Sequence, residues 1–181
     1  MRQAVYHNPP HIYIDNTVYI ITASTIHKQK YFNTDTKKQI LRSTIFKSIK
    51  KLRYNIFAWV IFADHYHILF EVVRSRFLAK LMNLINGRSS YMLNRLEKKS
   101  GRRIWYSYWD TCIRNIDDFY TRFNYIHNNP IKHKYINSLD ELPLYKYSSY
   151  SYYLETKGQE WISDIFIRYP IIDYVEKYDD Y

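Results

Sequence analysis

Residues 60–72 read Val-Ile-Phe-Ala-Asp-His-Tyr-His-Ile-Leu-Phe-Glu-Val, an apolar run that contains two histidines. The run is short and rich in β-branched and aromatic residues, which favours a β-strand. Side chains two residues apart on a strand point to the same face, so we expect His65 and His67 to project side by side. Two adjacent imidazoles can bind one divalent metal ion. The alternative is a pair of half-buried histidines that bind nothing.

The composition points to an anionic partner. The 181 residues suit one domain, carry a formal net charge of +10 and include 21 tyrosines. Cationic side chains interleaved with aromatic ones are typical of a surface that binds nucleic acid, especially a single strand. The alternative is a source genome whose base composition enriches Lys, Ile, Asn and Tyr together.

The cysteine content and the N-terminal residues indicate the cellular compartment in which we expect the protein. The single cysteine, Cys112, cannot form an internal disulfide, and no Cys-x-x-Cys motif is present. Residues 1–10 lack the apolar core of a signal peptide, and no segment approaches membrane-spanning length. We therefore expect a cytoplasmic protein without a membrane partner.

The order of predicted elements defines the fold class. The hydrophobic patterns predict four strands and two long helices, in the chain order strand 17–26, helix 35–53, strand 54–62, strand 65–73, helix 76–99 and strand 104–114. This β-α-β-β-α-β order is that of the split βαβ unit. We expect an α+β protein with a ferredoxin-like (RRM-like) antiparallel sheet and helices on one face.

Both long helices carry features that the pattern leaves open. Asn86-Gly87 in the middle of the second helix predicts a kink or a close approach by another group. The first helix has lysines beside its apolar stripe, and either a solvated face or DNA contact explains them: Lys37, Lys38, Lys47, Lys50 and Lys51.

A further helix is predicted over residues 117–128, ended by Pro130. Phe119, Phe123 and Ile126 form its apolar face, and Tyr125 lies about 200° around the helix from Phe123. A tyrosine on that polar face is either an ordinary surface residue or a phenol positioned among Arg and amide neighbours.

The histidine pair and Tyr125 are chemically compatible. A metal bound by His65 and His67 would polarise a phosphate, and Tyr125 could attack it to form a phosphotyrosyl intermediate. Asn129, one turn beyond Tyr125, could supply a third ligand through its side-chain oxygen. Two imidazoles and a carboxamide leave positions open for phosphate and suit Mg²⁺ or Mn²⁺.

The chain resembles the REP-associated tyrosine transposases, which belong to the single-tyrosine HUH superfamily (His-hydrophobic-His). The motifs that carry the resemblance cover about residues 10–155, and their order and spacing are specific only together. They are residues 58–61, 65–69 (His-Tyr-His-Ile-Leu), 84–90 (Leu-Ile-Asn-Gly-Arg-Ser-Ser), 104–105, 108–110, 113–115, 125–132 (Tyr-Ile-His-Asn-Asn-Pro-Ile-Lys) and 147–150.

The resemblance implies a DNA nickase and strand-transferase that acts on single-stranded DNA beside hairpins or inverted repeats. It implies His65, His67 and Asn129 as metal ligands and Tyr125 as the nucleophile that takes the 5′-phosphate. The family's usual Pro-Asn before the first histidine is Ala63-Asp64 here, and the middle HUH position is Tyr66 instead of an aliphatic residue. The sequence does not indicate what Asp64 does.

The resemblance also suggests a domain division and DNA contacts. We expect residues 1–155 to form the transposase domain and 156–181 an extension of unknown role, in a monomer or homodimer that associates with the nucleoid through DNA. Residues 147–153 are expected to form a loop. The expected DNA contacts, each with a solvated or packed alternative, are Arg88, Arg102, Arg103, Arg114, Lys132, His133, Lys134, Trp105 and Tyr108.

Two other functions are compatible with parts of the pattern. One is a replication initiator or relaxase of the HUH superfamily, although such proteins normally carry other motifs around the tyrosine. The other is a non-catalytic protein that binds nucleic acid on a ferredoxin-like sheet through stacking aromatics. Metal-independent binding without cleavage would favour the second.

Overall fold

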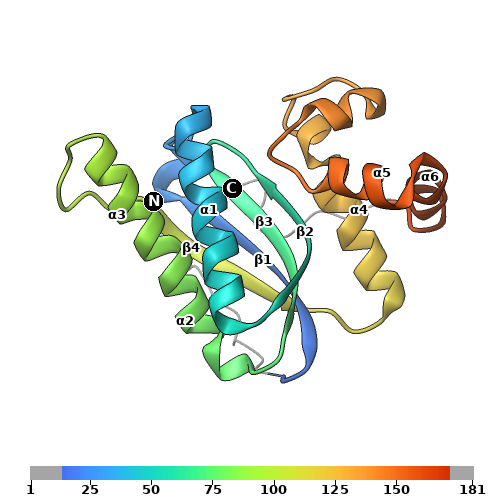
Figure 1. The fold of residues 1–181 in the computed structure, drawn as a ribbon, viewed down its shortest axis with the longest axis horizontal. Helices are drawn as coiled ribbons and strands as arrows, with labels where there is room; N and C mark the ends of the chain where they lie inside the picture. The colour runs from blue at the N-terminus through green and yellow to red at the C-terminus, as the bar shows by residue number, and fades with distance from the viewer. Residues whose placement is uncertain (1–13, 172–181) are drawn as a thin grey trace, which may run out of the picture.

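The computed structural model describes residues 14–171 and contains one four-stranded antiparallel sheet (Figure 1). The strands are β1 (Thr17–Thr25), β2 (Asn55–Ile61), β3 (His65–Val72) and β4 (Trp105–Cys112), in the spatial order β2-β3-β1-β4. The predicted α+β, ferredoxin-like fold is therefore confirmed.

The helices form two groups around the sheet (Figure 1). The first is the predicted layer on one face: α1 (Asp35–Leu52), the 3₁₀ turn η2 (Ser75–Phe77), α2 (Leu78–Met82), the π-helical segment η3 (Asn83–Gly87) and α3 (Arg88–Leu96). The second group is α4 (Ile116–Lys132), the 3₁₀ segment η4 (Leu139–Leu144), α5 (Tyr150–Lys157) and α6 (Gln159–Arg168). A short 3₁₀ turn, η1 (Ile26–Lys28), follows β1.

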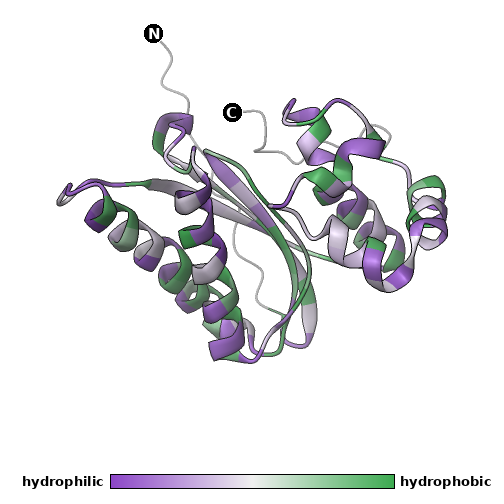
Figure 2. Ribbon diagram, turned by 45° about the horizontal axis from the view of Figure 1, so that its top comes forward, coloured by the Kyte–Doolittle hydropathy of each residue, from purple (hydrophilic) through white to green (hydrophobic). Residues whose placement is uncertain are grey.

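The side chains of the inner strand β3 point alternately to the two faces of the sheet. Tyr66 faces the helical layer, where its hydroxyl donates to Asn86 Oδ1 at 2.9 Å. His65 and His67 point to the opposite face. Figure 2 shows hydrophobic segments along the strands and mixed colouring along the helices, as expected for amphipathic helices on an apolar sheet.

The first helix begins and packs as its sequence predicts. Thr34 caps α1 by accepting a hydrogen bond from the Lys37 amide. The buried residues of its predicted apolar stripe are Leu41, Ile45 and Ile49. Phe46 meets Trp59 of β2 edge-on with ring centroids 5.5 Å apart. Burial of this stripe fixes α1 against the sheet.

The interruption at Asn86-Gly87 is a π-helical segment. Gly87 has an ordinary helical φ of −65°, and nothing lies within 4 Å of where its Cβ would be. The glycine is therefore not needed for a close approach. The extra residue in the turn coincides with Asn86, which accepts the Tyr66 hydroxyl.

The helix that carries Tyr125 is longer than predicted. Pro130 lies inside α4, which runs on to Lys132. A proline in the last turn removes only one helical donor, and the amides of His133 and Tyr135 still reach the carbonyls of Asn129 and Pro130, each at 2.9 Å. Asn129 is therefore held within the helix and not at a frayed end.

The prediction that Tyr125 lies on a polar face of α4 outside the core is wrong, and the alternative of an ordinary surface tyrosine is excluded. Tyr125 is 3% exposed and lies against β3. The reason is that α4 is covered on two sides. Phe123 packs on Trp161 of α6, and the Asn124 amide donates to the carbonyls of Ile165 and Tyr169 at 2.9 and 2.7 Å.

The prediction of a loop over residues 147–153 is also wrong from Tyr150 onward, because helix α5 begins there. The preceding residues pair with the sheet edge, since Val60 and Ser148 form an isolated antiparallel bridge. Helix α6, which lies in the predicted extension 156–181, packs on the helix that carries Tyr125. Residues 172–181 of that extension lie outside the described range.

His127 joins α4 to this returning segment. It is 1% exposed, and its Nε2 shares a 2.7 Å hydrogen bond with Ser149 Oγ, which in turn accepts from the Trp59 amide at 3.0 Å. Burial lowers the pKa of His127 from 6.5 to about 3. His127 is therefore a neutral structural residue.

This burial predicts a pH dependence of stability. Between pH 6.5 and about 3 the unfolded chain binds a proton at His127 that the folded chain does not, so stability falls as the pH falls. Relative to His127→Gln, the wild type should lose about 1.4 kcal/mol of unfolding free energy per pH unit in this window. Urea unfolding in EDTA at several pH values across the window measures the loss. His27→Gln, at an exposed residue, is the control, and equal pH profiles for wild type and His127→Gln would contradict this explanation.

Candidate active site

The two histidines of β3 are buried neighbours. Their ring centroids are 5.2 Å apart with an interplanar angle of 78°. His67 is fully buried and His65 is 3% exposed. The predicted side-by-side placement is confirmed, although the burial is deeper than the half-buried alternative assumes.

Each histidine has a partner for its Nδ1 atom. His67 Nδ1 lies 2.8 Å from Thr22 Oγ1, which stands opposite it in the β1–β3 register. His65 Nδ1 lies 2.6 Å from Asp64 Oδ1. Because each Nδ1 is engaged, a metal would be bound through Nε2, with Thr22 and Asp64 orienting the rings.

Ala63 and Asp64 both differ from the family's usual Pro-Asn. Of the two, Asp64 is the one whose side chain contacts a histidine of the pair. Burial raises its pKa, but the hydrogen bond with His65 and nearby positive charge, including Lys28, outweigh that effect, so the pKa lies below the usual range. A carboxylate that supports a histidine raises its basicity as a ligand.

Helix α4 brings Tyr125 to His67 and places Lys132 beside the Tyr125 ring. The Tyr125 ring meets His67 edge-on with centroids 5.6 Å apart. The Lys132 ammonium, two turns along the helix, lies 5.5 Å from the centre of the Tyr125 ring. A cation beside a phenol stabilises the phenolate that nucleophilic attack requires.

Asn129 lies one turn beyond Tyr125 and is 1% exposed. Neither its Oδ1 nor its Nδ2 hydrogen-bonds to any of residues 14–171. A buried amide without partners is costly and uncommon, and it marks a position that a ligand can complete. This observation fits Asn129 as an oxygen donor toward a metal.

The residues present fit a divalent cation with two imidazoles and one amide oxygen. Within residues 14–171 no group of three or more His, Cys, Asp or Glu is arranged to hold a metal. A site here therefore depends on Asn129 to complete the donor set, leaving further positions for oxygen ligands.

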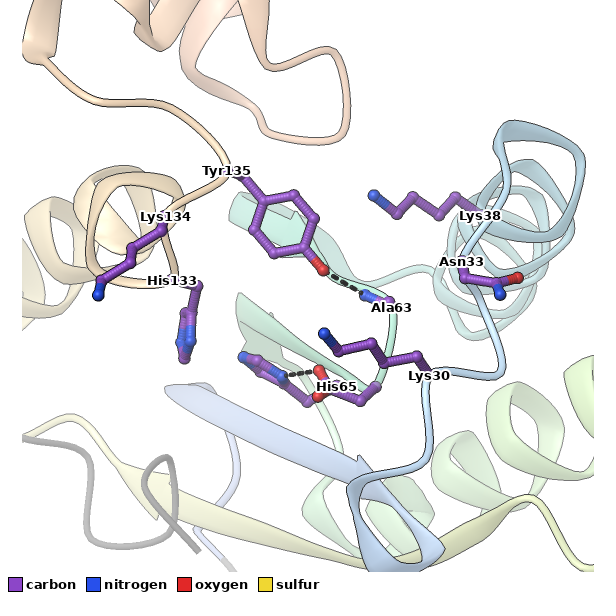
Figure 3. A pocket seen from close by; sticks show the side chains of 9 residues that line it. Lys30, Asn33, Lys38, Ala63, His65, His133, Lys134 and Tyr135 are labelled. Carbon is purple, nitrogen blue, oxygen red and sulfur yellow. Dashed lines mark hydrogen bonds and ion pairs between the residues drawn. The ribbon is translucent and has the colours of Figure 1, made fainter.

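His133 and Lys134, predicted as DNA contacts, also lie at this site. The His133 ring is 4.6 Å from the His65 ring, centroid to centroid, and 4.8 Å from Phe62. His133 and Lys134 line a cavity of about 460 Å³ beside His65. Figure 3 shows His133 pointing from the end of α4 toward His65.

The four arginines predicted to contact DNA make other contacts or lie apart. Arg102 binds Glu97 at 2.5 Å and Asn94 at 3.0 Å, which fastens the turn after α3. Arg103 donates to the carbonyls of Trp105 and Tyr106. Arg88 and Arg114 are exposed at the start of α3 and after β4. None of the four lines the cavity beside His65.

The two predicted stacking aromatics belong to the helical side of the sheet. Trp105 is 7% exposed, stacks on Phe32 at 5.3 Å and donates its indole N–H to Ser89 Oγ at 3.0 Å. It is a core residue in this structure and offers no free face to a base. Tyr108 is half-buried and pairs with Ala23 of β1.

Sequence patterns do not reveal several residues around the site. Thr22 follows only from the β1–β3 register, which a single sequence does not show. Lys38, expected among the surface lysines of α1, is 8% exposed. Lys38 lies one turn after the N-cap residue Thr34, and this position is the only hint that the sequence offers. In the structure, Lys38 lies on the side of α1 that faces the cavity.

The split βαβ sheet, the histidine pair on its inner strand β3 and the tyrosine on the helix after β4 are the features of the single-tyrosine HUH class of protein. Residues 13–129, more than half of the chain, match the transposase IS200-like family. The chain belongs to that family.

Individual relatives agree with this assignment. The chain is 24% identical over 133 residues to the REP-associated tyrosine transposase of Escherichia coli strain K12, covering 72% of this chain and 76% of the relative. A solved structure of a REP-associated tyrosine transposase bound to a REP hairpin aligns with a TM-score of 0.69 at 20% identity, covering 97% of this chain and 95% of that chain. The resemblance predicted from the motifs is thus confirmed. No helix within residues 14–171 combines the length and apolar character needed to cross a membrane.

The unsatisfied amide of Asn129 predicts an unusual mutational result. Asn129→Leu should raise the unfolding free energy in EDTA by about 1–2 kcal/mol, because it removes a buried polar group that has no partner among the described residues. Urea unfolding measures the change. The matched control is Asn124→Leu, equally buried on the same helix, which should lower stability by about 1–3 kcal/mol because Asn124 donates two hydrogen bonds. Equal destabilisation by both would show that the Asn129 amide is satisfied.

Proposed function

We propose that this protein is a metal-dependent single-stranded DNA nickase and strand-transferase that forms a transient 5′-phosphotyrosyl bond through Tyr125. The observation that carries the proposal is the contact of the Tyr125 ring with His67 of the buried histidine pair. The unsatisfied Asn129 amide, one turn beyond Tyr125 on α4, supports it. Membership of a transposase family supports it.

His65, His67 and Asn129 would hold Mg²⁺ or Mn²⁺. The bound ion would withdraw charge from a phosphate oxygen and make phosphorus more electrophilic. Thr22 and Asp64 keep the histidine rings oriented, so the ligand set is preorganised before DNA arrives.

Tyr125 supplies the attacking oxygen. Its Oη forms a bond to phosphorus while the bond from phosphorus to the 3′-oxygen of the preceding nucleotide breaks. The phenol proton leaves to solvent or a base, and the departing 3′-oxygen takes up a proton to become a 3′-hydroxyl. Lys132, 5.5 Å from the Tyr125 ring, favours the phenolate and the phosphate that approaches it.

The proposed substrate is single-stranded DNA beside a hairpin. A relative of the same fold was solved with a REP hairpin. The formal charge of +10 suits a polyanion, and the cavity that His65 lines would let an extended strand reach the histidine pair. A hairpin would position the adjacent single strand at the histidines.

A Tyr125→Phe variant tests the proposal. With Mn²⁺ and a 3′-labelled oligonucleotide that carries a hairpin from the DNA flanking the gene, the wild type should form a labelled protein–DNA adduct on a denaturing gel. Tyr125→Phe should form none, because only the attacking oxygen is removed.

Tyr120→Phe is the matched control, since it removes a phenol from the same helix five residues earlier. It should give adduct at the wild-type level. An adduct that persists in Tyr125→Phe, or is absent in the wild type with hairpins from both flanks, would refute the proposed function.

A further inference from the structure

The cavity beside His65 lies between the β2–β3 turn, the segment before α1 and the end of α4 (Figure 3). Its volume is about 460 Å³, within the range of about 300–1,000 Å³ that is usual for small-molecule sites. This volume suits a single nucleotide. Six of its lining residues are cationic or aromatic: Lys30, Lys38, His65, His133, Lys134 and Tyr135.

The charge of the cavity favours an anion. Three lysines line it, and its one carboxylate, Asp64, is engaged with His65. Figure 3 shows the amines of Lys30 and Lys38 reaching across from the α1 side, while Lys134 comes from the end of α4. A phosphate in the cavity would meet the amines of Lys30 and Lys38 from the α1 side, and Lys134 borders the cavity beyond the end of α4.

The side chain of Lys38 is buried in the wall of the cavity. It is 8% exposed, and its ammonium lies 4.7, 5.3 and 5.1 Å from the ring centres of Tyr135, Tyr145 and Tyr147. It donates to Tyr145 Oη at 3.3 Å and forms no ion pair with any carboxylate of residues 14–171. Burial lowers the pKa of Lys38, and a bound phosphate would offset that desolvation.

Tyr135 closes the cavity on the α4 side. Its hydroxyl accepts a hydrogen bond from the Ala63 amide at 3.2 Å, which ties the end of α4 to the β2–β3 turn. The cavity wall is therefore continuous with the turn that carries Asp64 and His65.

The cavity and Tyr125 meet different histidines of the pair. Tyr125 contacts His67, whereas His65 lines the cavity and contacts His133. In an in-line displacement at phosphorus the leaving oxygen departs opposite the attacking one. If Tyr125 attacks from the His67 end, the leaving 3′-oxygen points toward the His65 end.

We infer that this cavity binds the nucleotide on the 5′ side of the cleaved bond, the one that leaves with a free 3′-hydroxyl. Lys30, Lys38 and Lys134 bind its phosphate. The strand polarity rests on the proposed function, whereas binding of a DNA 3′ end in the cavity can be tested without cleavage.

The first test is an affinity label in EDTA. The probe is dT12 with one 3′-terminal ribonucleotide, which periodate converts to a dialdehyde that forms a Schiff base with a nearby lysine. Cyanoborohydride reduces and fixes the bond, and peptide mass spectrometry of the full chain locates it. We expect the label on Lys30, Lys38 or Lys134, whereas dT12 with a 5′-terminal aldehyde linker should label elsewhere.

The second test measures affinity for fluorescein-labelled dT12 at several salt concentrations. The double variant Lys30→Gln/Lys134→Gln should bind more weakly, and its slope of log K against log salt should fall by about 0.7 for each phosphate that the variant no longer binds. Lys47→Gln, exposed on α1 and outside the cavity, is the control and should match the wild type.

The outcomes separate the two claims. A 3′ label that falls outside the cavity, or on the same lysines as the 5′ label, or an unchanged salt slope in the double variant, would overturn the inference. The proposed function would still stand if Tyr125 forms its adduct. A cavity label together with no adduct in Mn²⁺ would refute the nickase and leave a binding site for DNA 3′ ends.

Discussion

The burial of His67 on an inner strand is the constraint on which the site depends. A polar ring with no exposed surface must have partners in the fold, and β1 supplies Thr22 for Nδ1 while α4 supplies the Tyr125 ring. Both partners are fixed by elements far apart in the sequence. The strand register and the seating of α4 therefore decide the geometry of the site together.

Helix α4, which bears the proposed nucleophile Tyr125, is packed on two sides. The side that bears Tyr125 and Asn129 faces β3, and the side that bears Phe123 and Asn124 faces α6. His127 adds a buried link to Ser149 and the sheet edge. Such support keeps a reactive group within a narrow range of positions, as preorganised sites require.

The sheet, its strands and the neighbouring histidines can be predicted from the sequence, because strand alternation and turn spacing are local properties. The prediction fails at Tyr125, because the single apolar stripe of α4 is only part of its buried surface. Sequence patterns also miss Thr22, the burial of Lys38 and the inward position of Trp105. These depend on contacts between distant segments, which no local pattern encodes.

The proposed chemistry requires that His65, His67 and Asn129 hold one divalent ion beside Tyr125. The most direct measurement is an anomalous difference map from crystals of the protein grown with Mn²⁺. We expect one peak about 2.0–2.3 Å from Nε2 of both histidines and from Asn129 Oδ1. A map with no peak there at saturating Mn²⁺, or with a peak only at other residues, would contradict the proposed metal site.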